Sequence, residues 1–125
     1  MQEKKTETGD EAQKALAFLE GAPVSLAFQD LDLAYVWFRN PPASWPASDV
    51  IGRTDADLFD DRVAAALTTA KREALKARTP RKFELSLGHD STARYYDIHI
   101  QPTSHASGEP DGILSVVVDV TDRRR

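Results

Sequence analysis

The chain of 125 residues has the length of one domain and is large enough to bury a hydrophobic core. Its 16 basic and 20 acidic residues give a net charge of −4, which offers no reason to expect binding to nucleic acid or to an anionic membrane. The lack of cysteine excludes disulfides, thiol nucleophiles and thiolate metal sites in this chain. No apolar run approaches the roughly 18 residues of a membrane span, and no signal-like leader opens the chain, so we expect a cytoplasmic domain.

The N-terminal part of the chain predicts a leader, a helix and a hairpin. Residues 1–9 are polar and patternless and predict a flexible leader. Residues 10–22 predict a short amphipathic helix, which Asp10 can cap and which a glycine ends. Residues 24–29 and 33–38 alternate as strands do, on either side of the turn-forming segment DLD. The two strands therefore predict a hairpin.

The second of these strands is rich in aromatic residues and stops abruptly. Tyr35 and Trp37 share one strand face, and we expect both to pack in the core rather than to stack on a ligand. Asn40-Pro41-Pro42 ends the strand, because proline lacks the N–H that a ladder needs and restricts the residue before it.

The next segment predicts a capped turn and the clearest helix of the chain. Thr54 and Asp57 have the spacing of a variant capping box. Residues 61–78 have apolar residues on one helical face and charges on the other. The face that we expect to be buried consists of Val63, Ala66, Leu67, Ala70 and Ala74.

Three further strands are predicted at residues 82–87, 94–101 and 113–120, with residues 103–112 as a loop. This order of elements favours an α+β domain, in which helices cover one face of an antiparallel sheet of about five strands. We place this domain at residues 23–122, and the last residues, 123–125, as the start of a linker helix that continues in a longer protein.

Several segments together resemble a PAS sensory domain. They are DVIGRTDADLF (49–59) before the long helix and VVVDVTDRR (116–124) at the end, where Asp119-Val120-Thr121 is similar to the family's closing Asp-Ile-Thr triplet. The segments QDLDLAYVWFRNPP, GRTDADLF and RYYDIHIQP resemble, more narrowly, the PAS modules of bacterial HWE-type sensor histidine kinases. The resemblance covers roughly residues 12 to 123. It implies a sheet that cups a small cavity, a homodimer, and a last strand that passes a signal to a C-terminal effector through Asp119 and Thr121.

The resemblance also implies which cofactors to exclude. Where flavin-binding members have a reactive cysteine this chain has Asp55, and where they have a flavin-contacting glutamine it has Val117. Haem-binding members offer a histidine from the long helix or its flanks, and residues 61–78 contain none. The histidines lack metal-ligand spacing, and we expect them on the surface: His89, His99 and His105. We therefore expect no flavin adduct, haem or metal, and an unknown small ligand stays open.

The candidate ligand site is the cavity that the sheet would cup. Strand alternation places Tyr96 and Ile98 on the cavity face. With the positions implied by the resemblance, the expected lining is Gln29, Asp55, Phe59, Leu67, Phe83, Tyr96, Ile98 and Val117. Inward Gln29 and Asp55 need hydrogen bonds, from a polar ligand, a helix terminus or water. For Asp55 we expect the capping of a helix terminus.

Three functions are compatible with the sequence. The first is a sensory domain, of a sensor histidine kinase for example, that detects a small ligand and relays the signal through its last strand. The second is a ligand-free module for dimerisation and relay, in which Leu26 and Phe28 face away from the cavity and are covered by the N-terminal helix or a partner. The third, a small enzyme, ranks last because no acid-base pair accompanies Asp55.

Overall fold

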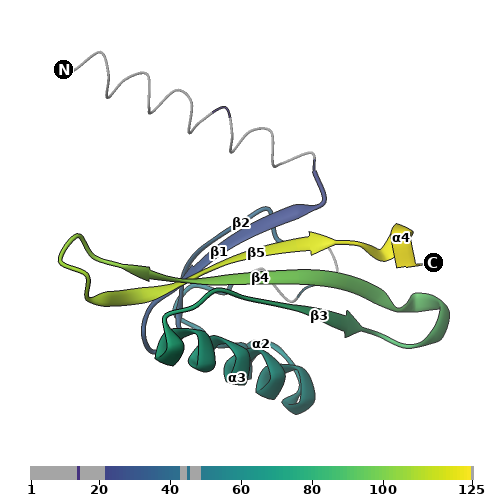
Figure 1. Ribbon diagram of the computed structural model, residues 1–125. Helices are drawn as coiled ribbons and strands as arrows, with labels where there is room; N and C mark the ends of the chain where they lie inside the picture. The colour runs from purple at the N-terminus through teal and green to yellow at the C-terminus, as the bar shows by residue number, and fades with distance from the viewer. Residues whose placement is uncertain (1–13, 15–21, 43–44, 46–48, 125) are drawn as a thin grey trace.

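The computed structural model describes residues 14, 22–42, 45 and 49–124 (Figure 1). The predicted leader, residues 1–9, and nearly all of the predicted helix, residues 10–22, lie outside the described residues. No helix among the described residues is long and apolar enough to cross a membrane.

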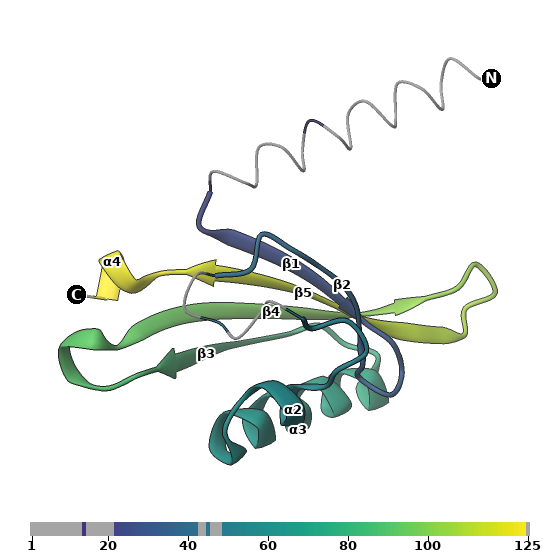
Figure 2. The ribbon, with the colours of Figure 1, turned by 180° about the vertical axis from the view of Figure 1, so that it is seen from behind.

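A five-stranded antiparallel sheet forms the centre of the described structure, with the strand order β2-β1-β5-β4-β3. The strands are β1 (Val24–Gln29), β2 (Tyr35–Arg39), β3 (Arg81–Leu87), β4 (Arg94–Ser104) and β5 (Pro110–Asp119). The helices are α2 (Asp55–Leu58), α3 (Asp61–Ala77), the single 3-10 turn η1 (Asp90–Thr92) and α4 (Thr121–Arg124). Helices α2 and α3 lie on the same face of the sheet (Figures 1 and 2), which confirms the predicted α+β class.

The hairpin between β1 and β2 forms as predicted, but its second strand carries an irregularity. Phe28 pairs with Trp37 and Gln29 pairs with Tyr35, so Val36 is one residue too many between the two pairs. Such a bulge turns the residues beyond it to the opposite face. The expectation that Tyr35 and Trp37 share a face is therefore wrong, since Tyr35 is buried whereas Trp37 stacks on Phe28 of the outer face.

The two longest strands extend past their predicted ends. The pairing of β4 with β5 continues through Thr103 opposite Gly112 and Ser104 opposite Pro110. Residues 103–112 were predicted as a loop from their polar, glycine-rich composition, and this prediction is wrong at both ends of the segment. Cross-strand hydrogen bonds override the weak strand propensity of these residues.

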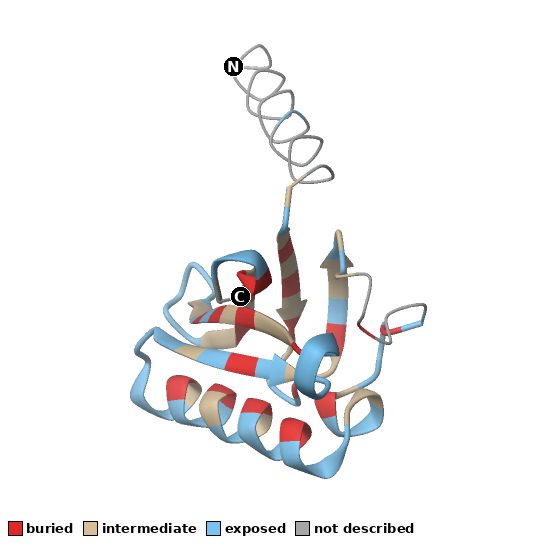
Figure 3. Ribbon diagram, turned by 90° about the vertical axis from the view of Figure 1, so that its right-hand side faces the viewer, coloured by how far each residue is buried: buried red, intermediate tan, exposed pale blue. Residues whose placement is uncertain are grey.

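Helix α3 packs one side against the sheet, and its buried stripe is rotated from the predicted one (Figure 3). The buried residues are Val63, Ala64, Leu67, Lys71 and Ala74, whereas Ala66 is exposed. Asp60 caps the start of the helix, where its side chain accepts a hydrogen bond from Val63 N, and the left-handed residue Arg78 caps the end. The stripe therefore includes a lysine that hydrophobicity alone assigned to the solvent face.

The core lies between α3 and the inner face of the sheet. Its buried members are Leu33, Trp45, Val63, Leu67, Ala74, Leu85, Tyr96, Ile98, Ile100, Ile113 and Val117. On the opposite face of the sheet, Leu26 and Phe28 of β1 are only half-buried, as the alternation of the strand predicts.

Gly112 marks a close approach between β5 and the end of β1. A Cβ atom at this position would lie 2.1 Å from the backbone oxygen of Gln29 and 2.8 Å from the ring of Phe28. We expect Gly112→Ala to lower the free energy of unfolding by about 2 kcal/mol or more, because the backbone has to move to relieve the overlap. Urea denaturation measures the change. In Gly108→Ala, where φ is +94° and nothing lies within 4 Å of the new Cβ, only backbone strain applies. A smaller effect at Gly112 than at Gly108 would contradict this account.

Candidate functional site

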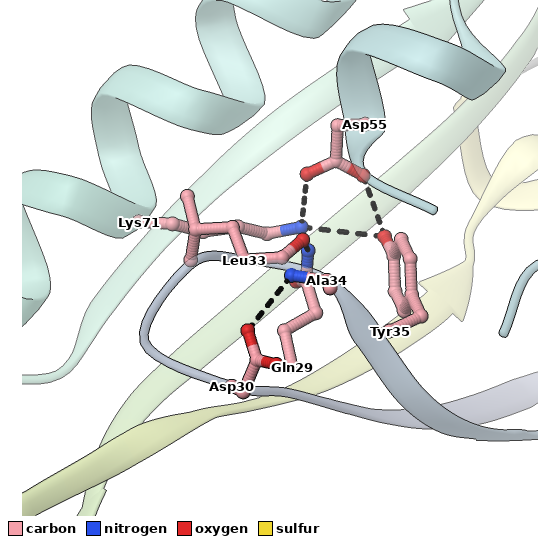
Figure 4. Close-up of polar contacts among 7 residues, drawn as sticks. All are labelled: Gln29, Asp30, Leu33, Ala34, Tyr35, Asp55 and Lys71. Atoms are coloured by element: carbon pink, nitrogen blue, oxygen red, sulfur yellow. Dashed lines mark hydrogen bonds and ion pairs between the residues drawn. The ribbon is translucent and has the colours of Figure 1, made fainter. Parts of the chain in front are cut away.

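Three polar side chains from different elements meet in the interior beneath the sheet (Figure 4). The ammonium of Lys71 from α3 donates to Asp55 Oδ2 of α2 at 2.6 Å, and the hydroxyl of Tyr35 from β2 donates to Asp55 Oδ1 at 2.6 Å. Lys71 also lies 3.4 Å from the Tyr35 hydroxyl oxygen and 5.4 Å from the centre of its ring. All three residues are at most 3% exposed, so the ion pair is shielded from water. We call this group the Asp55 cluster.

The backbone between β2 and α2 brings Asp55 to Tyr35. Tyr35 N donates to Arg53 O at 2.9 Å and Gly52 N donates to Tyr35 O at 2.8 Å, which holds the loop against the start of β2. Thr54 then caps α2, and its N–H donates to the Asp57 carboxylate as the capping-box spacing predicts. The expectation that Asp55 caps a helix terminus is wrong, because Thr54 occupies the cap and the Asp55 carboxylate turns inward to the lysine.

Burial controls the protonation of this cluster. Desolvation raises the pKa of the Tyr35 hydroxyl well above its usual value, and the neighbouring Asp55 carboxylate raises it further. Burial lowers the pKa of Lys71, and the attraction of Asp55 opposes this effect. Lys71 Nζ and Asp55 Oδ2 lie 2.6 Å apart, so the attraction between the two groups offsets part of the cost of burying them.

Gln29 lies at the end of β1 beside the cluster (Figure 4). Its amide N–H group donates to Leu33 O at 2.8 Å, which supports the left-handed turn residue Leu33 (φ 64°). Its carbonyl oxygen is buried and has no hydrogen-bond partner among the described residues. One half of this predicted inward polar group is thus satisfied by the turn.

A small cavity of about 10 Å³ lies beside the cluster. Its lining is Ala27, Tyr35, Phe38, Trp45, Leu67, Lys71, Ile98, Ser115 and Val117. Trp45 packs edge-on against Phe38, Phe59 and Tyr96, with ring centroids 5.1 to 6.1 Å apart. A space of this size is near the minimum that holds one water molecule.

The residues predicted from the sequence to line a ligand cavity all lie on the inner side, but the structure does not bring them all to one cavity. Leu67, Ile98 and Val117 line the small cavity. Phe59 and Phe83 pack against the core as partly buried side chains. Tyr96 is fully buried against Trp45 and also borders an open cleft at the other end of the sheet. Their role as ligand contacts stays a prediction.

Sequence reasoning missed three residues of this site. Lys71 falls four positions after Leu67 and three before Ala74, so it lies in the buried stripe of α3. The predicted inward carboxylate of Asp55 was the signal that a buried cation should accompany it. Ser115 lies two residues before the inward Val117 on β5, and residues two apart in a strand share a face, so its inward direction could have been predicted. Trp45 lies three residues after Pro42, outside every predicted helix and strand, so no periodicity predicted its burial.

The end of β5 carries the predicted relay residues. The Asp119 carboxylate accepts from Thr121 N at 3.0 Å and pairs with Arg94 of β4, and the Thr121 hydroxyl oxygen accepts from Tyr95 N at 3.0 Å. These bonds join the start of α4 to β4. The histidines, predicted to be surface residues, are exposed: His89, His99 and His105. Among the described residues, no group of three His, Cys, Asp or Glu side chains is placed to hold a metal ion.

The five-stranded antiparallel sheet, the helices on one of its faces and the closing Asp119-Val120-Thr121 are the features expected of a PAS domain. A sequence model described as PAS fold matches residues 19–125, and the chain belongs to this family. The match spans both the Asp55 cluster and the relay residues.

Two curated relatives are histidine kinases of plants. Histidine kinase 5 of Arabidopsis thaliana and probable histidine kinase 1 of Oryza sativa subsp. indica are each 29% identical over 106 residues, which is 84% of this chain. The match covers 12% and 11% of their lengths, so it concerns one segment of much longer proteins.

Solved structures share the fold at low sequence identity. A PAS domain from Colwellia psychrerythraea has a TM-score of 0.69 at 17% identity, over 90% of this chain and 98% of that one. VqmA bound to DPO has a TM-score of 0.68 at 16% identity, over 86% of this chain and 57% of that one. A VqmA-ligand-DNA complex of Vibrio cholera has a TM-score of 0.69 at 19% identity, over 88% and 51%.

We expect Lys71→Met to destabilise the domain by about 3 to 5 kcal/mol at pH 7, because it leaves the Asp55 carboxylate buried without its counter-charge. The double variant Asp55→Asn with Lys71→Met removes both charges and should recover a large part of that loss. Chemical denaturation of both variants gives the comparison.

The matched control is Lys76→Met, the same substitution at an exposed position of the same helix, which should change stability by less than about 1 kcal/mol. If Lys71→Met behaved like Lys76→Met, the buried Asp55 carboxylate would not depend on Lys71 for charge compensation.

Proposed function

We propose that this domain is the sensory and regulatory module of a signal-transduction protein, in which a small ligand in the interior biases β5 and α4. The observation that carries the proposal is the position of the cavity. Ser115 and Val117 line it from β5, and the same strand reaches the relay residue Asp119 two positions later. A change in occupancy therefore acts on the strand that leads to the output helix.

A histidine kinase is the effector that we propose to follow the domain. The support is the identity of the two curated relatives, both histidine kinases, whose length leaves room for other domains beside the matched segment. The HWE subtype rests on the sequence motifs alone. VqmA, a fold neighbour, is described in complex with DNA, but the low identity carries only the fold, and the net charge of −4 favours a domain that does not contact nucleic acid.

A ligand-free dimerisation and relay module is the second candidate, and the small interior supports it. A cavity of about 10 Å³ is far below the roughly 300 Å³ at which ligand pockets begin, so an organic ligand requires rearrangement of the core. The apolar outer side chains of β1 and β5, such as Leu26, Phe28 and Val116, are half-buried and offer a surface for a second copy of the chain.

Native mass spectrometry of the purified domain separates the two candidates. The sensor predicts a reproducible added mass that disappears on denaturation, and a compound of that mass should raise the melting temperature of a ligand-free sample. A ligand-free dimer, combined with no stabilisation in a screen of small metabolites, would exclude the sensor and support the packed relay module.

The relay residues predict a pH dependence. Although partial burial raises the pKa of Asp119, hydrogen bonds from Thr121 and the pairing with Arg94 outweigh it and lower the pKa below its usual value. The unfolded chain then binds a proton more readily than the folded one, so the contribution of Asp119 to stability is present above pH about 4 and is lost as pH falls through the folded pKa.

We expect the difference in stability between the wild type and Asp119→Asn to shrink as the pH falls below about 4. Thermal unfolding from pH 7 to pH 2 measures it. Asp122→Asn, at an exposed position of α4, is the control and should show no such trend. A constant difference for Asp119→Asn across this range would refute the pairing.

A further inference from the structure

Three buried polar atoms near the Asp55 cluster have no hydrogen-bond partner among the described residues: Gln29 Oε1, Trp45 Nε1 and Ser115 Oγ. Their residues are 0%, 8% and 4% exposed, so bulk solvent does not satisfy them. Buried polar groups in native proteins almost always have a partner, and each exception needs an explanation.

Two of these atoms belong to residues that line the same cavity. Trp45 and Ser115 both contribute to the space of about 10 Å³, together with Tyr35 and Lys71 of the Asp55 cluster. The indole N–H is only a donor, and the serine hydroxyl both donates and accepts. An occupant of the cavity that reaches these two atoms can accept a hydrogen bond from Trp45 and exchange one with Ser115.

The charges around the cavity restrict the occupant further. The only ionised groups of the Asp55 cluster are Lys71 and Asp55, which already neutralise each other at 2.6 Å. A charged occupant would bring a third charge into a buried site without a partner, which is strongly unfavourable. Apart from the uncharged Ser115, the remaining lining is aliphatic and aromatic, so it offers no further counter-charge.

We propose that this cavity is a binding site for one small neutral molecule that accepts a hydrogen bond from Trp45 Nε1 and bonds Ser115 Oγ, with water as its ordinary occupant. This inference deepens the proposed sensory role, because it names the class of group that a ligand has to insert here. A carbonyl or hydroxyl group takes the place of the water, whereas a carboxylate or an ammonium does not.

The site itself does not depend on the sensory role, and it links two parts of the fold. Trp45 comes from the segment between β2 and α2, and Ser115 is in the middle of β5, the central strand of the sheet. A molecule that bridges them connects that segment to the strand that ends at Asp119.

NMR spectroscopy on a Trp37→Phe background tests the proposal. The chain has two tryptophans, so this variant leaves Trp45 as the source of the one indole N–H signal. Trp37 lies on the outer face against Phe28, away from the cavity lining. We expect the Trp45 signal to show a cross-peak to water with the sign of a long-lived bound molecule. Absence of that cross-peak, in a sample whose spectrum is that of a folded domain, overturns the water site.

Formamide and formate are matched probes of the ligand class, since both have three non-hydrogen atoms and differ in charge. Formamide is larger than the cavity of about 10 Å³, so it can enter only if the lining side chains move. We expect it at millimolar or higher concentration to shift the Trp45 signal saturably, as its small size limits affinity to about that range. Formate at equal concentration and ionic strength should not. An equal response to formate contradicts a site for neutral groups. No saturable response to formamide contradicts the entry of any ligand group larger than water.

Ser115→Ala removes one of the two bridging groups with little change in shape. It should weaken the formamide response at least severalfold and shorten the lifetime of the bound water. Ser25→Ala is the matched control, because Ser25 is also a buried strand serine but its hydroxyl donates to Asn40 O and it does not line this cavity. Equal effects of the two variants would contradict the bridge. If these results hold while effector output is insensitive to every ligand, the sensory role fails and the site stands.

Discussion

The buried ion pair of Lys71 and Asp55 is the constraint on which the arrangement of the helices depends. Each charge is almost fully shielded from water, and each would be strongly unfavourable alone. The pair forms only if α2 and α3 pack at one relative position against the sheet. Tyr35 adds β2 to the same contact through its hydroxyl. We expect the pair to contribute more to the specificity of this arrangement than to net stability, since apolar residues of similar volume can stabilise a core as well.

The bulge at Val36 allows the Tyr35 side chain to reach this cluster. Alternation along the sequence did not predict the bulge. Alternation alone gave β1 its bounds and its inward side chains correctly, because nothing interrupts that strand. In β2 one extra residue separates Tyr35 from Trp37 and sends them to opposite faces. Neither the tyrosine nor the tryptophan indicates the bulge, because the bulge is set by the pairing of β2 with β1. Without the bulge, either the Tyr35 hydroxyl would leave Asp55 or Trp37 would have to enter a core that Phe38 already fills.

The antiparallel sheet, the hairpin of β1 and β2 and the long helix could be predicted from periodicity. The polar interior could be predicted only in part. Gln29 and Asp55 were predicted to point inward, yet the partner of Asp55 was missed because a lysine on a helix is ordinarily solvated. Trp45 was missed because it lies outside every predicted helix and strand, where no hydrophobic periodicity indicates which residues are buried. Asp55 and Lys71 are also 16 residues apart in the sequence, which is beyond the range of any local pattern. Such contacts depend on how elements pack, which one sequence does not state.

Under the proposed sensory role, the place of the cavity on β5 gives a small interior change a route to the end of the domain. At Ser115 the strand is paired on both sides, with Ala27 of β1 and Ile100 of β4, so it resists local distortion and moves with the sheet. The pairing with β1 ends at Val24 opposite Val118, after which Asp119 N bonds Pro23 O. Beyond that point the chain is held by the backbone bond from Val120 N to Tyr95 O and by side-chain contacts of Asp119 and Thr121. These contacts are fewer than those of the ladder, so under the proposed sensory role a strain applied at Ser115 would be relieved there, at the start of α4.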